Sequence, residues 1–210
     1  MNKEQWKNLI EWIICIIIAF ILAILIKYFI VTPTVVRQSS MYPTLKENQR
    51  LILNRWSRTT KQMPERGDII TFEAPSEKGI SDETFQTHIA QYKNKSNNYL
   101  YNFSYYVLEI NKESYIKRVI GLPNDRIEIK NGKVFINGNE YSEPYLQDTV
   151  ITDSRNSCFE DFIVPENCIF AMGDNREGSK DCRDFGCIPM EKIEGIVLIR
   201  FWPLNLFGKV

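Results

Sequence analysis

Histidine is nearly absent from this chain of 210 residues, which contains only His88. A hydrolase with a histidine base would depend on that single position, and a metal site built on imidazole ligands is disfavoured. An excess of charge is absent too, because 26 Lys and Arg balance 26 Asp and Glu. Nucleic-acid affinity rests mainly on neutralising phosphates, so we expect no nucleic-acid partner.

Cysteines are few and do not define a disulfide framework. Cys15 lies in an apolar run, and the other four are Cys158, Cys168, Cys182 and Cys187. The two close pairs, 158 with 168 and 182 with 187, are each near enough to bridge a loop, but spacing alone assigns neither pair. The spacings also differ from those of zinc fingers. We expect structural or idle thiols rather than ligands or nucleophiles, and no metal site.

One long apolar run is present, over residues 9–31, interrupted only by Glu11 and Lys27. It is long enough for a helix that crosses a membrane, which needs roughly 20 residues. Aromatic residues suited to the two interfaces lie near its ends, at Trp6, Trp12 and Tyr28. The alternative is a cleavable signal, but its apolar core is about 7–15 residues and small residues precede its cut. The sequence favours a retained anchor.

The residues before the anchor predict its orientation. Lys3 and Lys7 precede the run, and a short basic tail tends to stay in the cytoplasm, although Lys27 and Arg37 weaken this asymmetry. We therefore expect a cytoplasmic tail at residues 1–8, a single span in the cell membrane, and an extracytoplasmic domain at residues 32–210. A domain of that size can bury a core of its own.

The soluble part reads mainly as short strands. Segments rich in β-branched or apolar residues and bounded by turn formers predict strands at 34–36, 50–54, 68–72, 126–130, 133–136 and 193–201. Asn131-Gly132 predicts a tight hairpin turn, and Asn137-Gly138 closes the second strand of that hairpin. The predicted fold is mainly β, with sheets that close in a barrel-like manner.

Residues 75–112 differ from the rest, because they are charged, rich in Asn and Ser, and contain many tyrosines. We interpret them as a variable insertion. A partly helical stretch is expected over 82–92 and a strand over 105–110.

Ser40 is the candidate nucleophile. It lies in the segment 39–45, Ser-Ser-Met-Tyr-Pro-Thr-Leu, shortly after the apolar run. A serine hydroxyl needs a neighbouring base to become a nucleophile. Pro43 fixes φ and interrupts a simple strand, so the hydroxyl can be presented at a turn. An ordinary Ser/Pro turn without chemistry remains the alternative for this segment alone.

Lys117 is the candidate base, in the segment 115–121, Tyr-Ile-Lys-Arg-Val-Ile-Gly. A free lysine has a pKa near 10.4, so a base useful near neutrality needs a drop of roughly 2–3 units, or about 3–4 kcal/mol. Burial among apolar neighbours can impose that drop. The alternative is a solvated basic edge formed with Arg118. His88, the competing base, has no positioned acid nearby in the sequence, and we expect it to be exposed or locally hydrogen-bonded.

A loop rich in charges of both signs follows at residues 173–186. Bidentate Arg–Asp pairs would hold such a loop in one conformation. A calcium-binding acidic loop is the alternative, but Arg176, Lys180 and Arg183 offset the acids and disfavour a cation site.

Four segments together resemble the bacterial type I signal peptidases (leader peptidases), membrane-bound Ser/Lys endopeptidases that remove signal peptides from exported proteins. These segments are residues 40–45, 66–72, 115–125 and 173–183. The resemblance runs from the anchor to near the C-terminus, and it implies a barrel-like β-rich catalytic core, a second, variable β region and no cofactor. At position 117 this chain has lysine rather than histidine. In this respect it resembles the bacterial signal peptidases and not those of the endoplasmic reticulum.

The resemblance also implies roles for individual residues. Ser40 would attack the scissile carbonyl, with Lys117 as general base and then general acid, and the Ser40 N–H would donate to the oxyanion. Three supporting roles follow from the same resemblance: Ser179 orients the lysine amine, Asp181 pairs with Arg183 to support the loop, and Asp174 pairs with Arg118.

Three positions depart from the family pattern. Gln38 stands where some relatives have a serine that contributes an oxyanion donor, so the second donor is left open. Asn124 replaces a common glycine, which predicts an asparagine in the left-handed region. Glu177-Gly178 replaces the more frequent Asp-Asn pair.

The expected substrates are secretory preproteins, cut after small residues beside the lipid bilayer by a monomeric enzyme. The preprotein would add as an extended strand beside residues 36–40 and the strand that leads into Lys117. The candidate substrate-binding residues are Val36, Gln38, Met41, Leu45, Tyr115 and Ile116. Two alternatives remain: another Ser/Lys protease of related fold, such as a self-cleaving repressor, and a catalytically inactive membrane-tethered β-domain that only binds.

Overall fold

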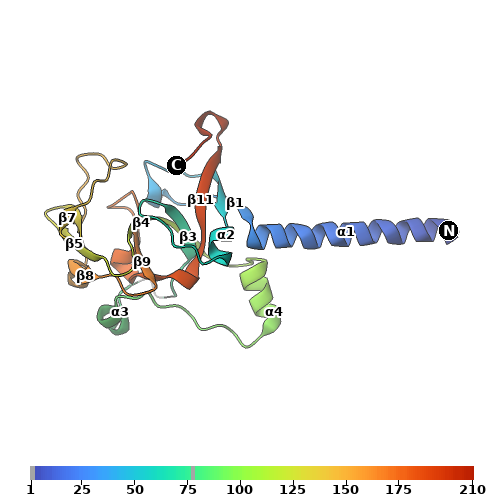
Figure 1. Ribbon diagram of the computed structural model, residues 1–210, viewed down its shortest axis with the longest axis horizontal. Helices are drawn as coiled ribbons and strands as arrows, with labels where there is room; N and C mark the ends of the chain where they lie inside the picture. The colour runs from blue at the N-terminus through green and yellow to red at the C-terminus, as the bar shows by residue number, and fades with distance from the viewer. Residues whose placement is uncertain (1–2, 77–78) are drawn as a thin grey trace.

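A single long helix projects from a β-rich domain (Figure 1). The computed structural model describes residues 3–76 and 79–210. Helix α1 (Lys3–Phe29) is long and apolar enough to cross a membrane, and none of its residues is buried against the protein. The helix ends two residues before the predicted span does, since Val31 already begins strand β1 and Pro33 prevents further helix.

Two antiparallel sheets build the domain. The larger has seven strands in the order β1-β2-β11-β3-β4-β9-β10. Their bounds are β1 Val31–Val35, β2 Arg50–Asn54, β3 Ile69–Glu73, β4 Ser114–Gly121, β9 Cys168–Met172, β10 Ile188–Pro189 and β11 Ile193–Trp202. The smaller sheet has the order β7-β6-β5-β8. Its strands are β5 Arg126–Lys130, β6 Lys133–Ile136, β7 Asn139–Glu140 and β8 Asp161–Ile163.

The predicted β-rich fold behind an apolar helix is confirmed, and several strands match closely. The predictions at 50–54, 126–130 and 133–136 coincide with β2, β5 and β6. Asn131 and Gly132 have φ of 53° and 76°, as the hairpin turn between β5 and β6 requires. Asn124 also has the expected left-handed backbone, with φ of 68°.

Helical segments are short outside α1. The α-helices are α2 Trp56–Thr59, α3 Asp82–Thr87, α4 Tyr99–Asn102 and α5 Cys182–Phe185. A π-helical segment, η2, covers Phe103–Val107. The 3₁₀ segments are η1 Ser39–Met41, η3 Ser157–Phe159, η4 Met190–Lys192 and η5 Leu204–Leu206.

The insertion at residues 75–112 contains helix where a strand was expected. Helix α3 lies within the predicted helical stretch, but the strand predicted at 105–110 is wrong, because α4 and η2 make 99–107 helical. The Asn98 side chain accepts hydrogen bonds from the N–H groups of Leu100 and Tyr101, at 3.0 and 3.2 Å, and so caps α4. Tyr101 and Tyr105 then stack one turn apart, with ring centroids 5.8 Å apart. Capping and stacking override the strand preference of tyrosine.

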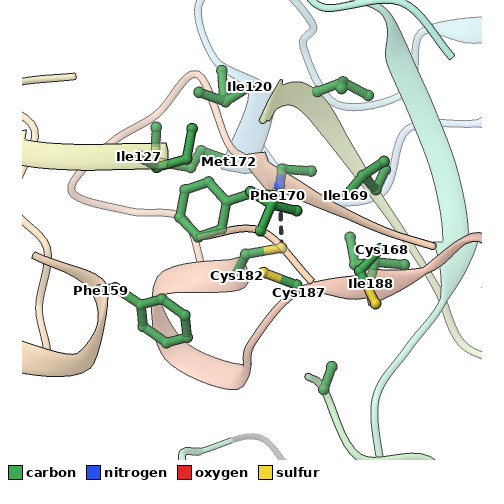
Figure 2. Close-up of a cluster of buried hydrophobic side chains, with 14 of the residues drawn as sticks. Ile120, Ile127, Phe159, Cys168, Ile169, Phe170, Met172, Cys182, Cys187 and Ile188 are labelled. Atoms are coloured by element: carbon green, nitrogen blue, oxygen red, sulfur yellow. Dashed lines mark hydrogen bonds between the residues drawn. The ribbon is translucent and has the colours of Figure 1, made fainter. Parts of the chain in front are cut away.

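The main hydrophobic core holds β4 and β9 in place. Figure 2 shows part of it, where Phe170 and Met172 of β9 lie near Ile120 of β4 and Ile127 of β5. Cys182 and Cys187 are buried in the same cluster, and the Ala171 N–H donates to Cys182 Sγ at 3.2 Å (Figure 2). All five cysteines are free, so neither possible disulfide is formed. Burial raises the pKa of the Cys182 and Cys187 thiols well above their ordinary range, which makes them unreactive.

Candidate active site

Ser40 lies on a tight turn at the end of the path that leads out of α1. After β1 the chain enters the 3₁₀ turn η1, in which the Tyr42 N–H donates to Ser39 O at 3.0 Å. The Leu45 N–H then donates to Met41 O at 2.9 Å. These bonds fix the backbone around Ser40, which is buried with 5% of its surface exposed.

Lys117 comes from the centre of the large sheet. Strand β4 pairs with β3 so that Lys117 lies opposite Ile70, and the lysine side chain is almost fully buried. Its Nζ lies 2.8 Å from Ser40 Oγ and 3.1 Å from Ile116 O. The fold therefore places the predicted base within hydrogen-bond distance of the predicted nucleophile.

The environment of Lys117 makes its neutral form more accessible than that of a free lysine. Burial lowers the pKa of the Lys117 amine to about 8, against the opposing influence of Asp181. Among the described residues, no carboxylate lies within ion-pair distance of this amine. A group with this pKa is roughly one-tenth neutral at pH 7. Lys117 can thus accept a proton near neutrality, as a general base must.

Arg118, the next residue of β4, is engaged elsewhere. Its Nε and Nη2 donate to the two carboxylate oxygens of Asp174, at 2.9 and 2.7 Å, and its Nη1 donates to Gly67 O at 2.9 Å. The guanidinium also lies over the Tyr145 ring, 4.0 Å from its centroid. The pairing of Arg118 with Asp174 attaches the charged loop to β4.

Asp181 and Arg183 form a second buried ion pair in that loop. Arg183 Nε and Nη2 each donate to the Asp181 carboxylate at 2.8 Å, and the Gly173 N–H donates to it at 3.0 Å. Burial alone would raise the pKa of the Asp181 carboxyl, but its hydrogen bonds with Arg183 hold that pKa below the ordinary value. Asp181 also caps α5, with Asp184 completing a capping box.

Asn175 joins this loop to the nucleophile, and the sequence did not single it out. Its backbone N–H donates to Ser40 O at 3.0 Å, and its side-chain amide donates to Ser39 O at 3.3 Å. Gly173 packs so closely here that a Cβ would lie 2.4 Å from Ser40 O. The position of Asn175 next to Asp174 in a recognised motif was the signal that could have identified it.

Ser179 is close to the dyad but does not make the expected contact. A Cβ on Gly173 would lie 2.1 Å from Ser179 Oγ, which shows how near this serine is to the loop that holds Ser40. Within residues 3–76 and 79–210, the buried Ser179 hydroxyl has no hydrogen-bond partner. The Lys117 amine bonds to Ser40 Oγ and Ile116 O, so the hydrogen bond expected from Ser179 is not formed here.

Further residues that support the loop were also missed. Arg155 donates to the Asp184 carboxylate and to Arg176 O, both at 2.6 Å. Arg176 in turn is buried and pairs with Glu143. Arg155 and Glu143 lie more than twenty residues before their partners in the chain, so no local pattern pointed to them.

A groove runs beside the dyad between β1 and the first half of β4. Its cavity has a volume of about 550 Å³ and is lined by residues 32–38 and 114–116, among others. Strand β1 is an edge strand, and β9 pairs with β4 only from Arg118 onward. Four of the predicted substrate-binding residues line this cavity: Val36, Gln38, Tyr115 and Ile116.

The other two predicted substrate-binding residues, Met41 and Leu45, do not line the groove. Both are fully buried in a small core with Leu51 and Ile69. Their side chains pack into this core and so support the turn that carries Ser40. The sequence identified them as apolar residues near the nucleophile but could not show which side of the turn they occupy.

His88 lies in a different environment from the dyad. It is half-buried, and its ring stacks on Phe162 with centroids 5.4 Å apart. The expected exposed or locally hydrogen-bonded histidine is thus replaced by one packed between aromatic rings. In the described part of the chain, no three His, Cys, Asp or Glu side chains gather in a group suited to a metal ion.

A buried lysine amine beside a serine hydroxyl on a tight turn, next to an open groove, is the arrangement of a serine hydrolase that uses lysine as its base. The comparisons with known proteins show that the chain is a peptidase. The chain belongs to the family described as signal peptidase, peptidase S26, whose model matches residues 9–202. It is therefore a peptidase, and the resemblance predicted from four short segments is confirmed.

Two signal peptidases match nearly the whole chain in sequence. Signal peptidase IB of Staphylococcus aureus (strain Mu50) is 34% identical over 96% of this chain and 93% of its own. Signal peptidase I S of Bacillus subtilis (strain 168) is 34% identical over 99% and 97% respectively. A solved signal peptidase I from Enterococcus faecalis V583 is 25% identical, with a TM-score of 0.42, over 64% of this chain and 97% of that one.

Proposed function

We propose that this chain removes signal peptides from exported preproteins, with Ser40 as nucleophile and Lys117 as general base. The observation that carries the proposal is the 2.8 Å separation of Lys117 Nζ and Ser40 Oγ at a buried site where the amine has a pKa of about 8. The names of the relatives, signal peptidase IB and signal peptidase I S, support the substrate class.

The mechanism follows from these two atoms. Neutral Lys117 takes the proton of Ser40 Oγ as the oxygen attacks the scissile carbonyl carbon. The resulting ammonium gives that proton to the leaving amine as the C–N bond breaks and the acyl-enzyme forms. Lys117 then deprotonates a water molecule, whose oxygen attacks the ester carbonyl carbon. The ester C–O bond breaks, the Lys117 ammonium returns the proton to Ser40 Oγ, and the signal peptide leaves as a carboxylic acid.

The backbone around Ser40 contributes to transition-state stabilisation. The Ser40 N–H would donate to the developing oxyanion, and one such preorganised donor is typically worth about 10²–10³ in rate. The bonds from Asn175 to Ser40 O and Ser39 O restrain the same turn. Supporting roles for Asp181, Arg183, Asp174 and Arg118 rest on their holding this loop against β4.

A preprotein would bind as an extra strand between β1 and β4. Strand β1 runs from the end of α1 towards Ser40, and the four antiparallel pairings from β1 to β4 give β4 the same direction. A chain emerging from a membrane beside α1 would run parallel to both. Main-chain hydrogen bonds would provide affinity, and alternate side chains would point into the groove near Val36 and Ile116. Cutting after small residues is consistent with a position this close to the buried dyad.

The apolar helix α1 supports a membrane location. Its length and composition suit a single span, and Lys3 and Lys7 at its start favour a cytoplasmic N-terminus. We infer that the catalytic domain lies on the extracytoplasmic side and acts as a monomer. A nucleophile near the end of α1 would suit substrates whose own apolar segment is still in the bilayer.

The test is processing of a purified preprotein by the full-length enzyme in detergent. Ser40→Ala and Lys117→Ala should each lower kcat/KM by roughly 10⁴-fold or more, because each removes a member of one catalytic unit. Ser142→Ala and Lys130→Ala, at exposed positions, are matched controls that should cleave normally. Mass spectrometry of the product locates the new N-terminus.

Two results would oppose the proposal. Near-normal cleavage by either dyad variant would exclude Ser40 and Lys117 as the catalytic pair. A wild-type enzyme that binds preproteins but cleaves none of them would favour the catalytically inactive, membrane-tethered binding module.

A further inference from the structure

One residue holds the peptide groups on both sides of the nucleophile. The backbone N–H of Asn175 donates to Ser40 O at 3.0 Å, and its side-chain Nδ2 donates to Ser39 O at 3.3 Å. These two carbonyls belong to the Ser39–Ser40 and Ser40–Met41 peptide groups, which meet at the Cα of Ser40. Because each peptide group is planar, holding both of them fixes φ and ψ of Ser40.

The Ser39–Ser40 peptide group carries the N–H that would donate to the oxyanion. This peptide bond is trans, so its carbonyl oxygen and its N–H point in opposite directions, and a bond to Ser39 O sets the direction of the Ser40 N–H. A 3₁₀ turn bonds an N–H to the carbonyl three residues earlier, which for Ser40 is Arg37, outside η1. The Tyr42 N–H donates to Ser39 O at 3.0 Å from within the turn, and the Asn175 amide is a second donor from outside it.

A second donor on Ser39 O also strengthens the Ser40 N–H. Hydrogen bonds that form a chain polarise one another, by roughly 10–30% per bond. A bond accepted by Ser39 O draws electron density from its peptide group, so the N–H at the other end becomes more positive. Developing charge is stabilised by donors that are in place before the reaction. The Asn175 amide thus acts on both the direction and the strength of this donor.

The loop holds the Asn175 amide in turn. Its Oδ1 accepts from the Gly178 N–H at 3.1 Å. Asp174, the preceding residue, is buried and pairs with Arg118 of β4. Asn175 is therefore held at its backbone through β4 and at its side chain by Gly178, which leaves Nδ2 directed at Ser39 O.

Gly178 makes room for this amide. A Cβ at position 178 would lie 2.6 Å from Asn175 Nδ2 and 3.0 Å from its Cγ, and the three nearest atoms all belong to the Asn175 side chain. Gly178 is itself exposed, so a methyl group there would displace the amide and little else. Glu177-Gly178 is also a departure from the Asp-Asn pair that is more frequent at these positions. The location of the amide therefore depends on a residue particular to this chain.

Resting on the proposed function, we propose that Asn175 is a positioning residue for the oxyanion donor, and that Gly178 admits its side-chain amide to Ser39 O. The amide holds the Ser39–Ser40 peptide group so that the Ser40 N–H points at the carbonyl oxygen under attack. The described lining of the groove does not include Asn175, so substrate affinity is independent of it. Its bonds reach Ser39 and Ser40 and not Lys117, so the pKa of the lysine amine is independent of it too.

The test is steady-state cleavage of a purified preprotein by the full-length enzyme in detergent. Asn175→Ala removes the side-chain bond but keeps the backbone bond to Ser40 O. It should lower kcat about tenfold at unchanged KM, which is part of the 10²–10³ that a whole oxyanion donor is typically worth. The midpoint of the pH profile should stay near 8, because the pocket of Lys117 is unchanged. Lys180→Ala, at an exposed position of the same loop, is the control that should keep the wild-type kcat.

A double-mutant cycle separates positioning from general damage to the loop. Gly178→Ala should lower kcat about as much as Asn175→Ala, because its methyl group displaces the amide. The double variant should be no slower than Asn175→Ala alone, because no amide remains to be displaced. Asn175→Asp keeps an acceptor for the Gly178 N–H but offers no donor to Ser39 O, so it should not restore kcat.

The outcomes distinguish the two proposals. A wild-type kcat in both Asn175→Ala and Gly178→Ala overturns the positioning role alone, as do losses that multiply in the double variant. A shifted pH midpoint or a raised KM at unchanged kcat overturns it as well, because Asn175 would then act on Lys117 or on the groove. If Asn175→Ala does not fold, Gly178→Ala decides. A wild type that cleaves no preprotein overturns the proposed function, and with it the positioning role.

Discussion

The pocket of Lys117 and the loop at residues 173–184 lie side by side, and both bury charged groups. In the loop, Asp181 and Arg183 neutralise each other, and Asp174 pairs with Arg118. Lys117 instead faces a serine hydroxyl and a carbonyl oxygen. Burial therefore lowers the pKa of Lys117 to about 8, whereas Arg183 holds the pKa of the Asp181 carboxyl below its ordinary value. Both pKa values are lowered, but the consequences differ: burial favours the neutral form of the Lys117 amine, whereas the Arg183 partner keeps the buried Asp181 carboxylate charged.

The presence or absence of a charged partner decides whether a buried cation holds the backbone in place or exchanges a proton. A paired arginine cannot give up its proton and serves to hold backbone in place. An unpaired lysine can exchange its proton, but only at the expense of stability. The neighbours Lys117 and Arg118 on β4 place both kinds of cation within one strand.

Breaking the loop should have the largest effect on stability. Asp181→Ala leaves Arg183 buried without its partner and the Gly173 N–H unbonded, so we expect a loss of about 3–5 kcal/mol of unfolding free energy. Cleavage should fall as well, because the loop holds Ser40 through Asn175. Denaturant unfolding and kcat/KM measure the two effects, and a loss below about 1 kcal/mol would mean that the pair does not support the loop.

The pH dependence of cleavage should report the neutral amine. The pKa of Lys117 is lowered to about 8, so the reactive neutral form is lost as pH falls below that value. We expect kcat/KM to be half-maximal near pH 8, to level off about one pH unit above it and to approach a tenfold fall per pH unit below it, reaching roughly 1% of the plateau near pH 6. A profile that stays flat down to pH 6 would exclude a lysine base.

Removing the buried amine should stabilise the protein. The folded state binds the Lys117 proton less tightly than the unfolded state, so burying this amine lowers the free energy of unfolding wherever the unfolded chain is protonated. This loss of stability is absent above the unfolded pKa of 10.5, grows as the pH falls to about 8 and is constant below that pH. Lys117→Met, after subtracting the lost bond to Ser40, should raise the unfolding free energy by about 2 kcal/mol at pH 7. Melting temperatures at pH 7 and pH 10.5 test this, because the gain should vanish at the higher pH.

The smallest effect should come from an exposed copy of the same ion pair. Arg126 and Asp161 form a bidentate pair like that of Arg183 and Asp181, but about half of each side chain is exposed. Asp161→Ala should cost less than about 1 kcal/mol and leave cleavage unchanged. A loss equal to that of Asp181→Ala would show that burial does not set the strength of these pairs.

The predictable parts of the fold are those that local chemistry determines. The hairpin of β5 and β6 follows from alternating residues around Asn131-Gly132, because both the pattern and the turn lie within a dozen residues. The failed strand at 105–110 has equally strong β-formers, but the Asn98 cap and the tyrosine stack made that segment helical. Strand preference alone could not reveal this competition.

The site divides in the same way. Ser40 and Lys117 were identified from short motifs, and the structure places them in contact. Met41 and Leu45 were assigned to the substrate, but the direction of their side chains depends on Leu51 and Ile69 from β2 and β3. Arg55 and Glu109 meet across 54 residues, and no pattern in either segment predicts that pair. Packing between distant segments determines the side-chain directions and ion pairs that short motifs do not specify.

Strand β1 has a consequence for where cleavage can occur. All five of its residues are in register with β2, from Val31 opposite Asn54 to Val35 opposite Arg50, so the path from α1 to η1 is not a loose tether. Even fully extended, the stretch from Phe29 to Ser40 spans at most about 40 Å. With α1 in a bilayer, the paired strand β1 would fix the distance between the lipid surface and Ser40. A scissile bond must be presented at that distance.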